Sequence, residues 1–156
     1  MRISRGNNSI SLAMFLIDTD VISETRQKSR ADTGVTRFFA NCVAASTPVF
    51  ISVVTVGELR RGVELMRHRG DALQAQRLDA WLTGLLADFA DYILDFSFDE
   101  AQIWGRLRVP RPENPIDKQI AATALTHDLT LVTRNVSHFK DLGLLLLNPF
   151  AARALP

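Results

Sequence analysis

The chain has 156 residues, 47% of them hydrophobic, which is enough for one compact domain with its own buried core. Its formal net charge is +1, so no overall field draws it onto nucleic acid or a membrane surface, and any polyanion site must be local. The single cysteine, Cys42, excludes an internal disulfide and a multi-thiolate zinc site, and it favours a reducing, cytoplasmic location.

The folded part of the chain is expected to begin with the apolar run that Met14 opens. Residues 1–13 are interpreted as an N-terminal extension that is disordered or a start-site artefact, because they lack the apolar core of a secretory signal. No apolar run approaches the roughly 20 residues of a membrane span. The domain is therefore expected over residues 14–150, with residues 151–156 as a C-terminal tail.

Short β-type apolar runs alternate along the chain with longer segments of helical periodicity. This order is typical of βα units that build a parallel sheet. We therefore predict an α/β fold with a central parallel sheet of about five strands and helices on both faces. The predicted strands are Met14 to Asp18, Pro48 to Ser52, Tyr92 to Asp95, Thr130 to Thr133 and Leu144 to Leu147.

The helical segments carry recognisable start and stop signals. Residues 54–67 and 72–90 have apolar residues at helical spacing, and Gly70 with Asp71 separates them, which predicts a helical hairpin. Ser97 with Glu100 resembles a capping box. Two further predictions are an N-cap at Asn114 before Pro115 and a loop over residues 106–112.

Four polar residues fall where successive βα units reach one edge of the predicted sheet. Asp18 ends the first strand, Glu58 lies one turn inside the next helix, Asp117 lies in a first helical turn, and Asn135 follows a later strand. Carboxyl edges of open α/β sheets are the usual place for ligands. We therefore interpret these four residues as candidate catalytic and metal-binding residues.

Each position also has a structural alternative. Glu58 has capping-box spacing from Thr55, and it can also pair with Arg61. Asp117 complements a helix dipole, and Asn135 can cap the short helix that follows it. What these alternatives leave unexplained is that all four residues meet at the same edge.

Three carboxylates held together repel one another unless a cation lies between them. Oxygen ligands without His or Cys favour a hard dication, Mg²⁺ or Mn²⁺. Such a centre can activate a water and polarise a phosphoryl oxygen, as phosphodiester hydrolysis requires. The pattern therefore indicates a metal-dependent nuclease.

Basic and hydroxyl residues near this edge are candidates for substrate binding. Arg134 is the best candidate for a phosphate contact, although a surface ion pair is an equal alternative. Thr133 and Lys118 are the further candidates, against structural roles for both. Arg106, Arg108 and Arg111 can extend a phosphate track, although charged loop residues are more often simply solvated.

Four ordered motifs follow one another along the chain, at Phe15–Glu24, Ile51–Gly62, Asn114–Ala124 and Leu131–Phe139. They resemble the motifs of PIN-domain ribonucleases, and the resemblance covers nearly all of the chain from residue 14 to about residue 150. Within that family the likeness is greatest to VapC-type toxins, including the FitB-like branch, of bacterial toxin–antitoxin pairs.

The resemblance implies an endoribonuclease dependent on Mg²⁺ or Mn²⁺, usually a homodimer, whose RNA cleavage is inhibited by an antitoxin protein. It implies that Asp18, Glu58 and Asp117 are the acidic metal-site residues and that Asn135 is the fourth, more variable member.

Two positions depart from the family pattern. Asp20 stands where Asn is common, and His138 stands where an Asp usually follows. The first adds a carboxylate that either strengthens cation binding or acts as an N-cap, and the second removes an acidic contributor. Two alternatives therefore stay open: a haloacid-dehalogenase-like phosphatase, which leaves Glu58 without a role, and a PIN-like module that binds without catalysis.

Overall fold

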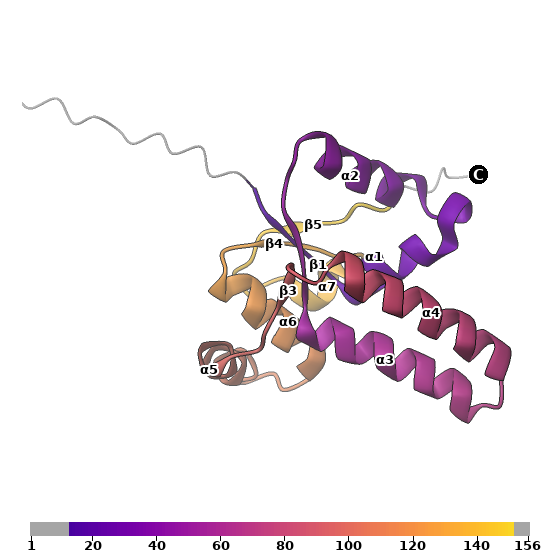
Figure 1. The fold of residues 1–156 in the computed structure, drawn as a ribbon. Helices are drawn as coiled ribbons and strands as arrows, with labels where there is room; N and C mark the ends of the chain where they lie inside the picture. The colour runs from indigo at the N-terminus through magenta and orange to yellow at the C-terminus, as the bar shows by residue number, and fades with distance from the viewer. Residues whose placement is uncertain (1–12, 152–156) are drawn as a thin grey trace, which may run out of the picture.

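The fold is a five-stranded parallel sheet between two layers of helices (Figure 1). The computed structural model describes residues 13–151, so the predictions for residues 1–12 and 152–156 lie outside the described residues. The predicted α/β class and the five strands are confirmed. In the spatial order β3-β2-β1-β4-β5, the strands are β1 (Phe15–Ile17), β2 (Val49–Ser52), β3 (Ile93–Leu94), β4 (Thr130–Val132) and β5 (Leu146–Leu147).

Adjacent residues of β1 point to opposite faces of the sheet and so begin two separate cores. Ile17 packs among residues of the helices at positions 19–24, 33–44, 53–68 and 72–88, whereas Leu16 packs against the helices at positions 115–126 and 136–139. Both side chains are fully buried. The helical segments are α1 (Thr19–Glu24), the 3₁₀ helix η1 (Thr25–Arg30), α2 (Thr33–Ala44), α3 (Val53–His68), α4 (Ala72–Asp88), α5 (Phe98–Leu107), α6 (Pro115–Thr126) and α7 (Val136–Phe139).

The boundaries differ from the predicted ones in two ways. The strands are shorter: β1, for example, ends at Ile17, because Asp18 is the N-cap of the helix that follows. The loop predicted over residues 106–112 begins only after Leu107, because α5 continues through Arg106. Of the helices in residues 13–151, none is long and apolar enough to cross a membrane.

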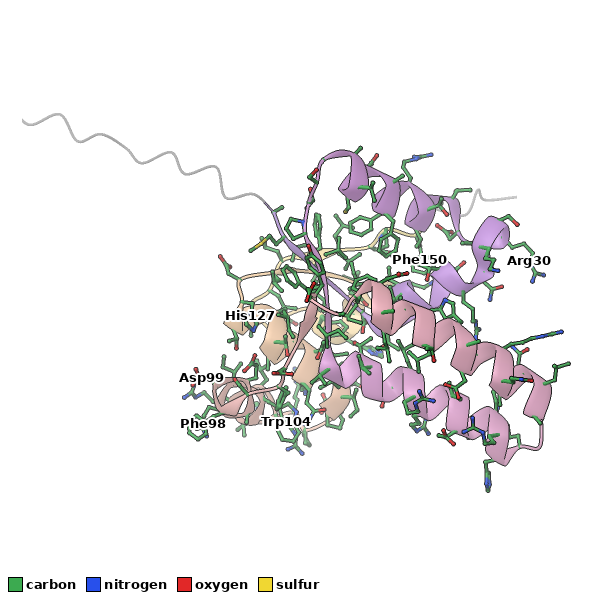
Figure 2. All side chains as sticks on the ribbon, in the orientation of Figure 1. Arg30, Phe98, Asp99, Trp104, His127 and Phe150 are labelled. Carbon is green, nitrogen blue, oxygen red and sulfur yellow. The ribbon has the colours of Figure 1, made fainter. Side chains whose placement is uncertain are left out.

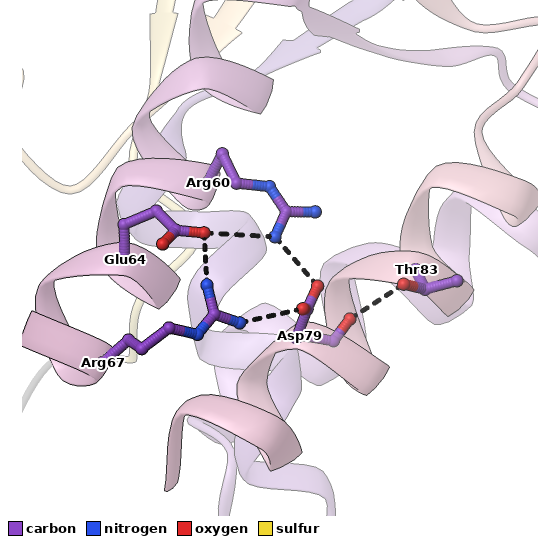
Figure 3. Close-up of polar contacts among 5 residues, drawn as sticks. All are labelled: Arg60, Glu64, Arg67, Asp79 and Thr83. Carbon is purple, nitrogen blue, oxygen red and sulfur yellow. Dashed lines mark hydrogen bonds and ion pairs between the residues drawn. The ribbon is translucent and has the colours of Figure 1, made fainter. Parts of the chain in front are cut away.

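The α3–α4 hairpin is confirmed, and Figure 3 shows the ion pairs on its surface. Arg60 of α3 lies 2.9 Å from a carboxylate oxygen of Asp79 on α4, and Arg67 lies 3.3 Å from the other oxygen. Exposed pairs of this kind contribute at most about 1 kcal/mol each. The hairpin is held mainly by buried apolar residues such as Leu82 and Val63.

Asp32 fastens the end of the described chain to α2. Its Oδ1 caps the helix by accepting from the backbone N–H groups of Gly34 and Val35, and it also accepts from the N–H of Ala151 at 2.9 Å. A Cβ added to Gly34 would overlap the carbonyl oxygen of Pro149. We therefore predict that Gly34→Ala lowers the free energy of unfolding by about 1–3 kcal/mol, measured by urea denaturation.

Gly84→Ala is the matched control for this prediction. Gly84 lies inside α4, and a Cβ there meets nothing within 4 Å. Because alanine is the better helix former, this variant should gain up to about 1 kcal/mol. An equal effect of the two substitutions would contradict the packing argument.

Candidate functional site

Asp18 is held at the carboxyl edge of the sheet by hydrogen bonds from two distant parts of the sequence. Its Oδ1 accepts a hydrogen bond of 2.8 Å from the backbone N–H of Thr19, which makes it the N-cap of α1. Its Oδ2 accepts one of 2.7 Å from Thr133 Oγ1, at the end of β4. Only 4% of Asp18 is exposed, so its carboxylate has a fixed position.

Burial raises the pKa of the Asp18 carboxyl from 3.8 to about 6. The hydrogen bond from Thr133 opposes this rise, and the negative charges of Asp20 and Asp117 add to it. Asp18, Asp20 and Asp117 therefore lie near enough to one another for their charges to interact. A positive charge among them would remove the cost of ionising Asp18.

Asp20 contributes a third carboxylate at this edge, as the sequence allowed. Its Oδ2 accepts from the backbone N–H of Arg134 at 3.2 Å, whereas its Oδ1 is buried and has no hydrogen-bond partner. Burial is the main cause that raises the pKa of Asp20, and the charge of Asp117 adds to it. The alternative that Asp20 is the N-cap is wrong, because Asp18 caps α1.

Asp117 lies in the first turn of α6 and contacts His138 of α7. The two are joined by a distance of 2.7 Å between Asp117 Oδ2 and His138 Nδ1. In the sequence, His138 marks the loss of an acidic residue, and a surface or capping role is the other interpretation. The structure instead makes it the partner of a candidate ligand, which no spacing in the sequence indicates.

Glu58 lies in the second turn of α3 and is half-buried. The alternative of a Thr55–Glu58 capping box is wrong, because Ser52 is the N-cap and its Oγ accepts from Val54 N. Thr55 Oγ1 instead accepts from Thr19 Oγ1 at 3.4 Å, which ties α3 to α1 beside Asp18. None of the ion pairs formed within residues 13–151 joins Glu58 to Arg61.

Asn135 directly precedes α7 and is exposed. Its backbone N–H donates to Thr133 Oγ1 at 3.0 Å, and its side chain makes no capping hydrogen bond to the helix. The capping alternative is therefore wrong for this side chain. The Thr133 hydroxyl therefore hydrogen-bonds both to the backbone N–H of Asn135 and to the carboxylate of Asp18.

The three candidate substrate-binding residues have different surroundings. Arg134 is exposed, with its guanidinium carbon 4.5 Å from the ring centre of Phe150, which Figure 2 labels. Thr133 is fully buried, so it positions Asp18 and does not reach a bound polymer. Lys118 is 4% exposed and its Nζ donates to the carbonyl of Arg111, which gives it a structural role.

The donor set fits a hard dication, although the side chains are not gathered around one point. Among residues 13–151, no three acidic, His or Cys side chains form a group that could hold a metal ion. Each carboxylate has its own hydrogen-bond partner instead: Asp18 has Thr133, Asp20 has the N–H of Arg134, and Asp117 has His138. The unpartnered Oδ1 of Asp20 and the raised pKa of Asp18 are the features that a cation would relieve.

The sequence of this chain is similar to those of known proteins. Residues 15–143 match the family described as PIN domain. The toxin FitB of Neisseria gonorrhoeae is 31% identical over 143 residues, which cover 88% of this chain and 99% of FitB. The VapC ribonuclease Y4jK of Sinorhizobium fredii is 29% identical over 143 residues, which cover 88% of this chain and 98% of Y4jK.

Solved structures give the same result for the fold. A chain in the crystal structure of FitAcB from Neisseria gonorrhoeae has a TM-score of 0.71 and 30% sequence identity with this chain. The match covers 87% of this chain and 98% of that one. The two chains therefore share their fold over most of their length.

Proposed function

This chain belongs to the PIN-domain family, and we propose that it is a divalent-metal-dependent endoribonuclease that acts as the toxin of a toxin–antitoxin pair. The observation that supports this most directly is the set of acidic side chains at the carboxyl edge of the sheet. Asp18 has its pKa raised to about 6, and Asp20 keeps a buried carboxylate oxygen without a partner. Relatives named as a toxin and as a VapC ribonuclease support the activity.

Asp18, Glu58 and Asp117 would hold Mg²⁺ or Mn²⁺, with Asn135 as a neutral oxygen donor and Asp20 as an added carboxylate. This set contains only oxygen donors, which suit a hard dication. When bound, the cation supplies an activated water and polarises a phosphoryl oxygen for hydrolysis of the phosphodiester bond.

The other residues of the chain fix the positions of these ligands. Thr133 holds Asp18 through its hydroxyl, and the N–H of Thr19 holds the second carboxylate oxygen. His138 orients Asp117 through the 2.7 Å contact. Arg134 lies exposed at the same edge, where its planar guanidinium can bind a backbone phosphate.

The partners in this proposal are an RNA substrate, a cognate antitoxin protein and a second copy of the chain. The alignment covers 99% of the toxin FitB, so this chain has a counterpart for nearly all of that protein. The molar mass of the purified chain in solution, measured alone and with its antitoxin, tests whether the homodimer and the complex form.

The test of the activity is cleavage of single-stranded RNA by the purified chain. We expect cleavage in Mg²⁺ or Mn²⁺, none in EDTA, and recovery when Mn²⁺ is added back. The products should carry 5′-phosphate and 3′-hydroxyl ends, because the nucleophile is a water. Cyclic 2′,3′-phosphate ends would instead show attack by the ribose hydroxyl and would contradict the metal-dependent mechanism.

The remaining alternative is a PIN-domain module without catalysis. Such a module would leave RNA intact, and Mn²⁺ would not raise its melting temperature. A catalytic chain should be stabilised by Mn²⁺, because a ligand that binds only the folded state shifts the unfolding equilibrium. The phosphatase alternative is not supported, because the matched family is the PIN domain over residues 15–143.

A further inference from the structure

A cavity of about 600 Å³ lies beside the candidate site, between the α5–α6 loop and α7. Its walls include Arg106, Arg111, Asn114, His138 and Lys140. Cavities of this size accommodate ligands as large as a nucleotide. Apolar residues such as Leu107 and Leu142 also line the cavity, and its charged side chains suit a ligand that carries charge.

The cavity is continuous with the acidic edge through one residue. His138 lines it and also contacts Asp117 at 2.7 Å. Asn114, on the opposite wall, directly precedes the helix that carries Asp117. The cavity therefore lies next to Asp117, one of the candidate metal-site carboxylates.

Three cations reach this cavity from different segments of the chain. Arg106 comes from the last turn of α5, Arg111 from the following loop and Lys140 from the end of α7, and all three are exposed. None of the ion pairs formed within residues 13–151 uses them. Glu113 and Asp141 also line the cavity. Its surface therefore carries both positive and negative side chains.

The loop that carries Arg111 is fixed from both sides. Lys118 is buried and its Nζ donates to the carbonyl of Arg111. Trp104 Nε1 donates to the carbonyl of Pro115 at 3.0 Å, and the guanidinium carbon of Arg108 lies 4.6 Å from the Trp104 ring centre (Figure 2). The wall is therefore organised before any ligand binds, which lowers the entropy cost of binding.

We propose that this cavity binds the backbone phosphates of single-stranded RNA next to the bond that is cleaved, with Arg106, Arg111 and Lys140 as the phosphate contacts. The inference rests on the proposed function, since it assigns the path of the same substrate. Arginine offers two parallel donors to a phosphate, and lysine offers a point charge. Phosphate contacts hold the polymer in register without selecting its sequence.

The test measures RNA binding in a chain that cannot cleave. In an Asp18→Asn background, the Arg111→Gln/Lys140→Gln pair is compared with the Arg30→Gln/Arg77→Gln pair, which removes two exposed arginines outside the cavity. The probe is a fluorescent single-stranded RNA of about 12 nucleotides. We expect the slope of log K against log salt to fall by about 1.4 for the cavity pair, at about 0.7 per lost phosphate contact, and to stay unchanged for the control pair.

Equal affinities and equal salt slopes for the two pairs would overturn the inference. The measurement does not require RNA cleavage, because only binding is measured. The proposed function fails on a different observation, namely intact RNA after incubation of the unmodified chain with Mn²⁺. All four substituted residues are exposed, so both pairs should keep the melting temperature of the background chain.

Discussion

Asp117→Asn is expected to reduce RNA cleavage by about a hundredfold to a thousandfold or more while leaving the fold intact. The substitution removes one carboxylate charge from the candidate metal site and keeps the shape of the side chain. It also replaces an ionised partner of His138 by a neutral one. The measurement is the initial rate of RNA cleavage at saturating Mn²⁺, with the far-ultraviolet circular dichroism spectrum as the check on folding.

Asp91→Asn is the matched control, because Asp91 is exposed and precedes β3 at the opposite, amino edge of the sheet. This variant should cleave RNA at the original rate. Asp18→Asn should behave like Asp117→Asn. Undiminished cleavage by both of these variants would refute the assignment of the acidic edge as the catalytic site.

The second large effect concerns stability against pH in the absence of metal. The folded chain holds the Asp18 proton with a pKa of about 6, above its ordinary value of 3.8. A proton bound more tightly in the folded state favours folding at low pH, so stability should fall as pH rises from about 4 to about 6. The pKa difference corresponds to about 3 kcal/mol, and this cost persists above pH 6.

Asp18→Asn should remove this part of the pH dependence, because an amide does not ionise. The free energy of urea unfolding, measured in EDTA near pH 4.5 and near pH 8, gives the difference between the variant and the original chain at each pH. We expect the variant to gain relative stability at the higher pH by up to about 3 kcal/mol. If the difference in unfolding free energy between the variant and the original chain does not change with pH, burial does not raise the pKa of Asp18.

The strands could be predicted from the sequence because each is a short apolar run between turn signals, but several of their ends could not. Asp18 continues the pattern of β1, yet it lies outside the strand and serves as the N-cap of α1. No element is predicted over α2, although Val35, Phe38, Phe39 and Cys42 have the spacing of one helical face.

The location of the candidate site could also be predicted, since parallel strands present their carboxyl ends at one edge. The partners of its side chains could not, because they depend on tertiary packing. Thr133 reaches Asp18 and His138 reaches Asp117 across long stretches of sequence. The family resemblance is confirmed by the match over residues 15–143, whereas the roles of the individual site residues stay predictions.

The hydrogen bond between Thr133 and Asp18 joins residues separated by 115 positions. β1, the first strand to leave the ribosome, is central in the sheet and pairs with both β2 and β4. During synthesis, Asp18 therefore lacks its supporting hydroxyl until residue 133 has been translated. A nascent chain that stops before this residue has no assembled acidic edge, so under the proposed function it should not cleave RNA.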